Sequence, residues 1–265
     1  MLKILNMTKK TSIRNIVKSF FQNIFKTRCN KNIEHKKSIK TFVSNRARGV
    51  NKQKVDEMMQ KVSPKLIKNP SDIYKLFTSG KYTQIALEIG SGYGQTAICF
   101  AKNNPSILYI ACEVYIKGLE NTFKNLASQK LDNLYLHSGD ALDLIDSIKN
   151  YNRFKIDYLF VLYPDPWRKT KHHKRRIFKE KNLQTFSSTM LAGSQLLFAT
   201  DHDDYKQWTM QVLVEHLSGG DKKFSWQASN HDHFNNPPQW WTSTKYEQKA
   251  IAEGRKPMYI TLIKD

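Results

Sequence analysis

The 265-residue sequence has few cysteines and no paired cysteine motif. Its three cysteines, Cys29, Cys99 and Cys112, do not form the C-x-x-C spacing of zinc sites or dithiol redox motifs. A sparse, odd count is typical of reduced thiols in a reducing compartment. No His and Cys cluster has zinc-ligand spacing, so the sequence predicts no metal site.

Long apolar runs are also missing. No stretch approaches the roughly 20 apolar residues that a membrane-spanning helix needs, so we expect no stable membrane insertion. The apolar residues amount to 40% of the chain, with 14 Phe, 5 Trp and 12 Tyr among them. This is enough to fill a substantial core, which argues against a chain that is disordered throughout.

Acidic residues are absent from the start of the chain. Residues 1–33 contain eight Lys or Arg and no Asp or Glu, and Ile, Val and Phe recur there at helical spacing. Such a leader is typical of a transit peptide, an RNA-binding arm, a membrane-surface helix or a flexible basic tail. We therefore separate an N-terminal extension, 1–39, from a domain spanning 40–265. The expected location is the cytoplasm, or the mitochondrial matrix if 1–39 is a transit peptide.

Across the whole chain, positive charge dominates. Lys and Arg number 43 against 23 Asp and Glu, which gives a formal net charge of +20. An excess of this size favours a polyanionic partner, either a nucleic acid or an anionic membrane surface.

Apolar runs alternate with amphipathic segments from residue 85 onwards, which predicts an α/β fold. The expected strands are Ile85–Gly90, Leu108–Val114, Leu134–Asp140, Ile156–Tyr163, Leu196–Thr200 and Met258–Lys264. The expected helices are Gln95–Lys102, Lys117–Gln129, a short helix between the third and fourth strands, Asn182–Leu191 and Tyr205–Leu217. This order predicts a mainly parallel, doubly wound sheet. Residues 218–257, rich in aromatics, Asn and Pro, are expected to form a loop-rich elaboration near the site.

The first strand runs into a glycine-rich turn. The sequence places Glu88 two residues before Gly90, and Gly92 and Gly94 follow at alternate positions. Glycines in such a turn let a ligand approach the backbone closely. A nicotinamide fingerprint has G-x-G-x-x-G spacing. The G-x-G-x-G spacing found here instead suits a donor without a pyrophosphate, such as S-adenosylmethionine.

Acidic residues also end the next two strands. Glu113, 25 residues after Glu88, is placed to accept hydrogen bonds from both ribose hydroxyls of a nucleoside. Asp140 is placed to accept one from an adenine amine. Three acids at successive strand ends beside a glycine loop predict a nucleoside site like that of the Rossmann-like class I methyltransferases.

The fourth strand carries the most specific pattern. It continues into P-D-P-W, where two prolines restrict the backbone around Asp165. Six of the nine residues in 168–176 are Lys or Arg, so this run can bind several phosphates at the ligand-binding edge of the sheet.

This block resembles the signature of the bacterial tRNA (guanine-N7)-methyltransferase family. Ala199–Asp201 and the T-K-Y-E sequence at 244–247 also resemble elements of that family, and the resemblance covers about 40–265. Two departures are visible. Lys171 stands where Arg is usual, which loses bidentate geometry, and the basic element at 46–49 matches only loosely.

The resemblance implies S-adenosylmethionine as the cofactor and tRNA as the partner, with guanosine 46 of the variable loop as the target. It implies that Asp165 is catalytic and lies next to donor and base. The implied donor-binding residues are Glu88, Gly90, Gly92, Gly94, Glu113, Asp140 and Asp165. The implied substrate-binding residues are Lys169, Asp201, Thr244, Lys245, Tyr246 and Glu247. The implied RNA-binding residues are Lys171, His172, His173, Lys174, Arg175 and Arg176.

Other functions stay open at this stage. The fold could serve a nicotinamide-dependent enzyme, a methyltransferase acting on another RNA, or an RNA-binding protein without activity. Retention of the strand-end acids together with the P-D-P-W block favours the enzyme. The sequence does not specify an oligomeric state, and a monomer is the working expectation.

Overall fold

The computed structural model describes residues 57, 59–220, 222–226, 228 and 232–265. The proposed extension 1–39, its boundary at 40 and the basic element at 46–49 lie outside the described residues. Within the described part of the chain, no helix is both long and apolar enough to cross a membrane.

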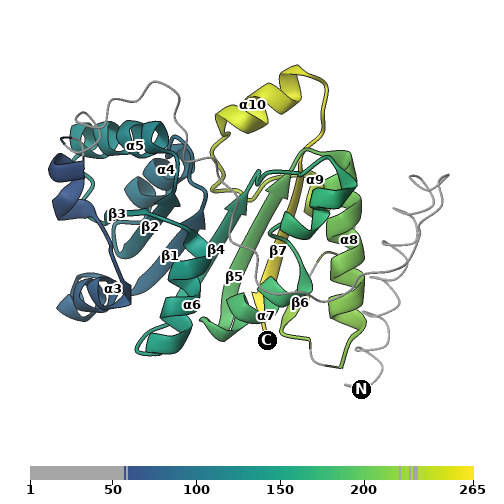
Figure 1. Cartoon of the computed structure of the whole chain (residues 1–265), viewed down its shortest axis with the longest axis horizontal. Helices are drawn as coiled ribbons and strands as arrows, with labels where there is room; N and C mark the ends of the chain where they lie inside the picture. Colours follow the sequence, from purple (N-terminus) through teal and green to yellow (C-terminus); the bar gives the residue numbers. More distant parts are fainter. Residues whose placement is uncertain (1–56, 58, 221, 227, 229–231) are drawn as a thin grey trace.

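One seven-stranded sheet forms the centre of the molecule (Figure 1). Its strand order is β3-β2-β1-β4-β5-β7-β6. The strands are β1 (Gln84–Ile89), β2 (Ile107–Glu113), β3 (Leu134–Ser138), β4 (Ile156–Leu162), β5 (Met190–Thr200), β6 (Phe224–Trp226) and β7 (Met258–Lys264). Strands β1 to β5 pair in parallel, whereas β7 is antiparallel to both β5 and β6.

Alternate residues of the central strands enter two separate apolar cores. In β1, Ile85 and Leu87 belong to one core and Ala86 to the other. All seven residues of β2 are buried. Strands buried on both faces need helices on both faces, and this explains their nearly continuous apolar sequences. The predicted mainly parallel, doubly wound α/β sheet is therefore confirmed.

Helices cover both faces of this sheet (Figure 1). They are α3 (Pro70–Leu76), α4 (Gln95–Asn103), α5 (Ile116–Gln129), α6 (Ala141–Tyr151), α7 (Glu180–Ser188), α8 (Asp203–Ser218), α9 (Asp232–Asn235) and α10 (Lys245–Ala252). Buried residues of α4 and α5 enter one core, and those of α3, α6, α7 and α8 enter the other. The short turns are η1 (Ser63–Lys65), η2 (Phe77–Lys81) and η3 (Thr170–Arg175).

Several predicted boundaries differ from the structure. β5 begins at Met190, six residues before the predicted start, and the preceding helix ends at Ser188. β3 ends at Ser138, so Asp140 caps the following helix instead of ending the strand. The segment 218–257, expected to be loop-rich, contains β6, α9 and α10. Of these, α10 lies above the carboxyl ends of the parallel strands (Figure 1).

Candidate active site

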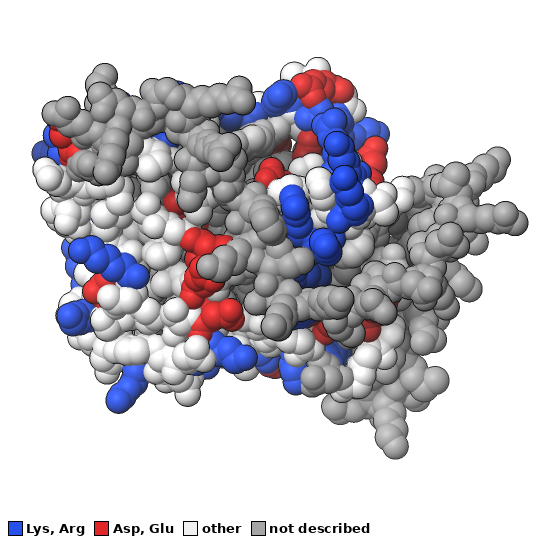
Figure 2. Space-filling view, in the orientation of Figure 1, with Lys and Arg blue, Asp and Glu red and all other residues white. Residues whose placement is uncertain are grey.

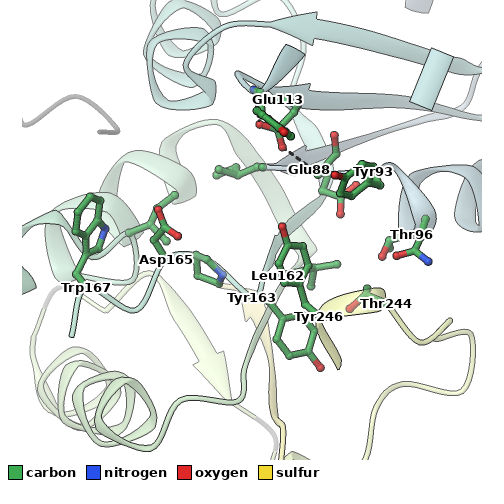
Figure 3. A pocket seen from close by; sticks show the side chains of 18 of the residues that line it. Glu88, Tyr93, Thr96, Glu113, Leu162, Tyr163, Asp165, Trp167, Thr244 and Tyr246 are labelled. Atoms are coloured by element: carbon green, nitrogen blue, oxygen red, sulfur yellow. Dashed lines mark hydrogen bonds between the residues drawn. The ribbon is translucent and has the colours of Figure 1, made fainter. Parts of the chain in front are cut away.

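A cavity of about 280 Å³ opens where the parallel strands end. Its wall combines the end of β1, the glycine loop, the end of β2, the P-D-P-W loop after β4 and the start of α10. Chain order reverses on the two sides of β1, which pairs with both β2 and β4. Ligands of open parallel sheets bind at such a switch point. Figure 3 shows Glu88 and Glu113 on one side of this cavity and Asp165 with Trp167 on another.

The glycine loop requires glycine for two different reasons. Gly90, Gly92 and Gly94 all have positive φ, at 72°, 56° and 75°. Other residues adopt this region only with strain. At Gly94 space is lacking as well, because an added Cβ would lie 2.3 Å from the Oγ1 of the buried Thr122. The loop conformation is thus fixed by these residues, as the predicted donor site requires.

Glu113 holds the glycine loop in place. Its Oε2 accepts a hydrogen bond from the Gly92 N–H at 2.6 Å. Its Oε1 accepts bonds from the N–H groups of Val114 and Tyr115, each at 2.8 Å. A carboxylate has about four acceptor positions, so at least one remains for a ligand hydroxyl. Glu113 therefore shapes the site as well as lining it, a role that the sequence pattern did not indicate.

Glu88 lies deeper and is only 3% exposed. Burial is the largest cause that raises the pKa of its carboxyl to about 7, and the nearby charge of Glu113 adds to the rise. The Tyr109 hydroxyl, which donates to Glu88 at 3.0 Å, acts in the opposite direction. A cation bound in the cavity would favour the ionised form of Glu88.

Ser91 also lines the cavity. Its hydroxyl is buried and has no hydrogen-bond partner among the described residues. An unpaired buried hydroxyl is unfavourable, so a polar ligand group in this position would stabilise it. The cavity thus offers carboxylates and a hydroxyl to a cationic, polar ligand.

The P-D-P-W loop presents Asp165 at the cavity mouth. The residues that flank Pro164–Pro166, Tyr163 and Trp167, both have positive φ, 50° and 48°. Such conformations in bulky residues are uncommon and cluster at functional sites. Asp165 is exposed, and among the described residues none donates a hydrogen bond to its carboxylate or pairs with it. Partial desolvation by the surrounding loop raises the pKa of Asp165 above its ordinary value.

The start of α10 forms the opposite wall. Thr244 caps the helix and, with Tyr246, lines the cavity. Lys245 places its Nζ 5.0 Å from the centre of the Tyr93 ring on the glycine loop. The structure therefore places Thr244 and Tyr246 in the cavity wall, and it places the exposed Lys245 beside the glycine loop.

Glu247, also predicted to bind substrate, has a different environment. It is 4% exposed, and its carboxylate accepts hydrogen bonds from Trp241 Nε1, the Tyr259 hydroxyl and the Thr244 N–H. These contacts anchor the start of α10 to β7. Glu247 does not line the cavity; it fixes the start of α10, which does.

Other predicted residues lie outside the cavity wall. Asp140 uses Oδ1 to cap α6, where it accepts from the Leu142 N–H at 2.9 Å. Asp201 pairs with Arg255, whose Nε lies 2.7 Å from its Oδ2. Lys169 is exposed at the start of η3. Direct contacts of these three residues with a ligand stay predictions.

The basic run divides into exposed and buried members. Lys171 and Lys174 are exposed, and His172, His173 and Arg175 are half-buried around Trp167 and Asp204. Figure 2 shows Lys and Arg side chains gathered beside and below α10 on this face. Arg176 differs from the prediction, because it is 0% exposed and cannot reach a phosphate from this position. Sequence alone gave no sign of this, since Arg176 continues an unbroken basic run.

Sequence reasoning missed residues that support the acids. Tyr109 is an ordinary apolar strand residue in the pattern, yet it bonds to Glu88. Arg255 lies 54 positions from its partner Asp201. The signal that could have pointed to Trp167 is its place directly after the constrained P-D-P turn.

Comparison with known proteins identifies the family of this chain. Residues 82–260 match a family model described as "Putative methyltransferase". A tRNA (guanine-N(7)-)-methyltransferase of Roseobacter denitrificans is 35% identical over 221 residues, which are 81% of this chain and 90% of the relative. The Bartonella quintana protein of the same name is 36% identical over 197 residues, 74% of this chain and 81% of the relative. The chain therefore belongs to the tRNA (guanine-N7)-methyltransferase family.

Proposed function

We propose that this protein transfers the methyl group of S-adenosylmethionine to N7 of a guanine in tRNA, with guanosine 46 as the target. The observation that carries the proposal is a carboxylate, Asp165, exposed and unpaired among the described residues at the mouth of a cavity lined by two further acids. The family membership supports the same reaction and the same substrate class.

The donor half of the cavity fits S-adenosylmethionine. The remaining acceptor capacity of Glu113 suits the ribose hydroxyls, and Glu88 and the Ser91 hydroxyl suit polar or cationic parts of the molecule. When bound, S-adenosylmethionine supplies a methyl group already activated by its sulfonium. The protein's task on this side is to hold that methyl group toward the cavity mouth.

Asp165 lies in the part of the cavity that would hold guanine, the methyl acceptor. Guanine N7 carries a lone pair and no proton, so the reaction needs no general base. A free carboxylate can accept hydrogen bonds from guanine N1–H and N2–H, which fixes the base so that N7 is in line with the methyl group. The same negative charge stabilises the positive charge that the purine gains. Asp201 is a weaker candidate for this edge, because Arg255 already occupies one of its oxygens.

The direct test is methyl transfer to tRNA transcripts in vitro, followed by mapping of N7-methylguanosine. Modification of a transcript with guanosine at position 46, and none when adenosine replaces it, is the expected result. Modification only at other positions, or only in another RNA, would point to a methyltransferase with a different target. Binding of tRNA without transfer would point to an inactive RNA-binding protein.

Replacing Glu113 with Gln is expected to weaken S-adenosylmethionine binding. The amide loses the charge and turns a donor toward the backbone N–H groups that now bind the carboxylate. Hydrogen bonds to charged groups contribute about 1.5–3 kcal/mol, so the loss in affinity should lie in that range. Calorimetric titration measures it. Glu120→Gln, at a surface carboxylate of α5 paired with Lys124, is the matched control. Equal affinities for the two variants would remove Glu113 from the donor site.

The exposed lysines of η3 are expected to contact tRNA phosphates. Replacing Lys171 and Lys174 together with Ala should lower the slope of log affinity against log salt by about 0.7–0.9 for each lost contact. Filter binding across a salt series measures the slope. Lys68→Ala with Lys149→Ala makes the same change in net charge at two exposed residues outside the basic run, one just before α3 and one in α6. If the two double variants lower the salt slope equally, η3 acts through the net charge of the protein and its lysines do not contact phosphates.

A further inference from the structure

Arg176 is a fully buried arginine beside the proposed active site. It ends the basic run, and it is the largest of the fully buried side chains among the described residues. A buried guanidinium is unfavourable unless it is paired and hydrogen-bonded. The groups that pair with Arg176 therefore indicate its role in the structure.

The guanidinium joins two segments of the chain. Its Nε donates to the Pro166 carbonyl at 2.9 Å, one residue after Asp165. Its Nη2 bonds to the carboxylate of Asp204 in the first turn of α8, and its Nη1 donates to the Asp204 carbonyl at 3.4 Å. The P-D-P-W loop is thus tied to the start of α8.

Aromatic residues of α8 enclose the same group. The Arg176 guanidinium lies 4.9 Å from the centre of the Tyr205 ring and 5.3 Å from that of Trp208. Both rings are themselves fixed to Phe178, since Trp208 Nε1 donates to its carbonyl at 2.7 Å and the Tyr205 hydroxyl accepts from its N–H at 3.1 Å. A guanidinium with its donors and both ring contacts in place has little freedom to move.

We infer that Arg176 is a positioning residue: it fixes the loop that carries Asp165 relative to α8 and to the exposed basic helix η3. The inference rests on the proposed function. Arg176 directly follows η3, which ends at Arg175, and its guanidinium bonds to Pro166. A tRNA bound to η3 would therefore be connected to the P-D-P-W loop through Arg176. Arg176 therefore sets where Asp165 lies relative to bound RNA, without touching phosphate, donor or base.

Two variants release this contact in different ways. Arg176→Met keeps most of the side-chain volume and removes the hydrogen bonds. Asp204→Asn leaves Arg176 in place and weakens its anchor, and because the Asp204 side chain is 49% exposed, the fold should tolerate the change. Asp203→Asn is the matched control: it removes the same charge from the same helical turn, but its side chain is 86% exposed and pairs with Lys206.

The expected result is a fall in the single-turnover transfer rate at saturating tRNA. Small misplacements of reacting groups lower rates by up to about 100-fold, so a fall of tenfold or more is expected for Arg176→Met and a smaller one for Asp204→Asn. Donor affinity and the salt slope of tRNA binding should match those of Asp203→Asn. Hydrogen exchange of the backbone in 163–169 should speed up in both variants, whether or not transfer is detected.

Three outcomes would overturn the inference. A salt slope lowered by about 0.7–0.9 in Arg176→Met, with a normal saturated rate, would make Arg176 a phosphate ligand. Normal rates and normal exchange in 163–169 would make it an ordinary core residue. Arg176→Met could lose transfer rate, donor affinity and melting temperature together, while Asp204→Asn transfers at the same rate as Asp203→Asn. Arg176 would then stabilise the whole fold and would not position the loop. Absence of transfer by the unmodified protein would instead count against the proposed function, and the exchange data would still decide the inference.

Discussion

Asp165→Asn is expected to lower single-turnover methyl transfer by at least about 100-fold. The amide is nearly the same size as the carboxylate, so the loop between Pro164 and Pro166 should keep its conformation. It loses the negative charge, and it offers N–H donors to a guanine edge that also presents donors. N7 would then be held out of line with the methyl group. Transfer to unmodified tRNA, with enzyme in excess, measures the effect.

Binding measurements separate this result from a general loss of structure. Phosphate contacts dominate tRNA affinity, so the affinity of Asp165→Asn for tRNA at fixed salt should change little. Its affinity for S-adenosylmethionine should fall by far less than the transfer rate, because Glu113 and the glycine loop are untouched. A variant with near-normal turnover would make Asp165 structural. Loss of binding and turnover together would indicate a collapsed site.

Gly94→Ala is expected to be far more disruptive than Gly90→Ala. Both glycines have positive φ, which disfavours alanine by about 1–2 kcal/mol. At Gly94 the new Cβ would also meet the buried Thr122 side chain, whose hydroxyl donates to the Gly118 carbonyl. Overpacking of this kind costs about 1–3 kcal/mol more. At Gly90 nothing lies within 4 Å of the added atom.

Denaturant unfolding measures the stability of the two variants, and calorimetry measures their donor affinity. Gly94→Ala should lose about 2–5 kcal/mol of stability and most of its donor binding, because the start of α4 has to shift. Gly90→Ala should lose only the smaller, conformational part. Equal losses would mean that Thr122 moves aside freely and that only backbone strain matters at Gly94.

The sequence was sufficient to predict the parallel strands and the order of the chemical groups along them. Strands such as β1 and β2 are buried on both faces, and such strands are recognisable in the sequence as nearly continuous apolar runs. The strand ends follow from the same runs, so Glu88, Glu113 and Asp165 could be placed at one edge of the sheet. The G-x-G-x-G turn and the P-D-P-W block are local patterns, and local backbone restrictions act within a few residues.

Pairing between distant residues was decided only by the tertiary structure. Arg176 and Lys174 look alike in the sequence, yet one is buried against Asp204 and the other is exposed. Glu247 and Asp165 are both acids in family motifs. The carboxylate of Glu247 accepts hydrogen bonds from Trp241 and Tyr259, whereas that of Asp165 is unpaired among the described residues. Burial and hydrogen-bond partners depend on which segments pack together in space. The sequence therefore determined the strands and turns that carry the candidate groups, and packing determined which of these groups line the cavity and remain available to bind a substrate.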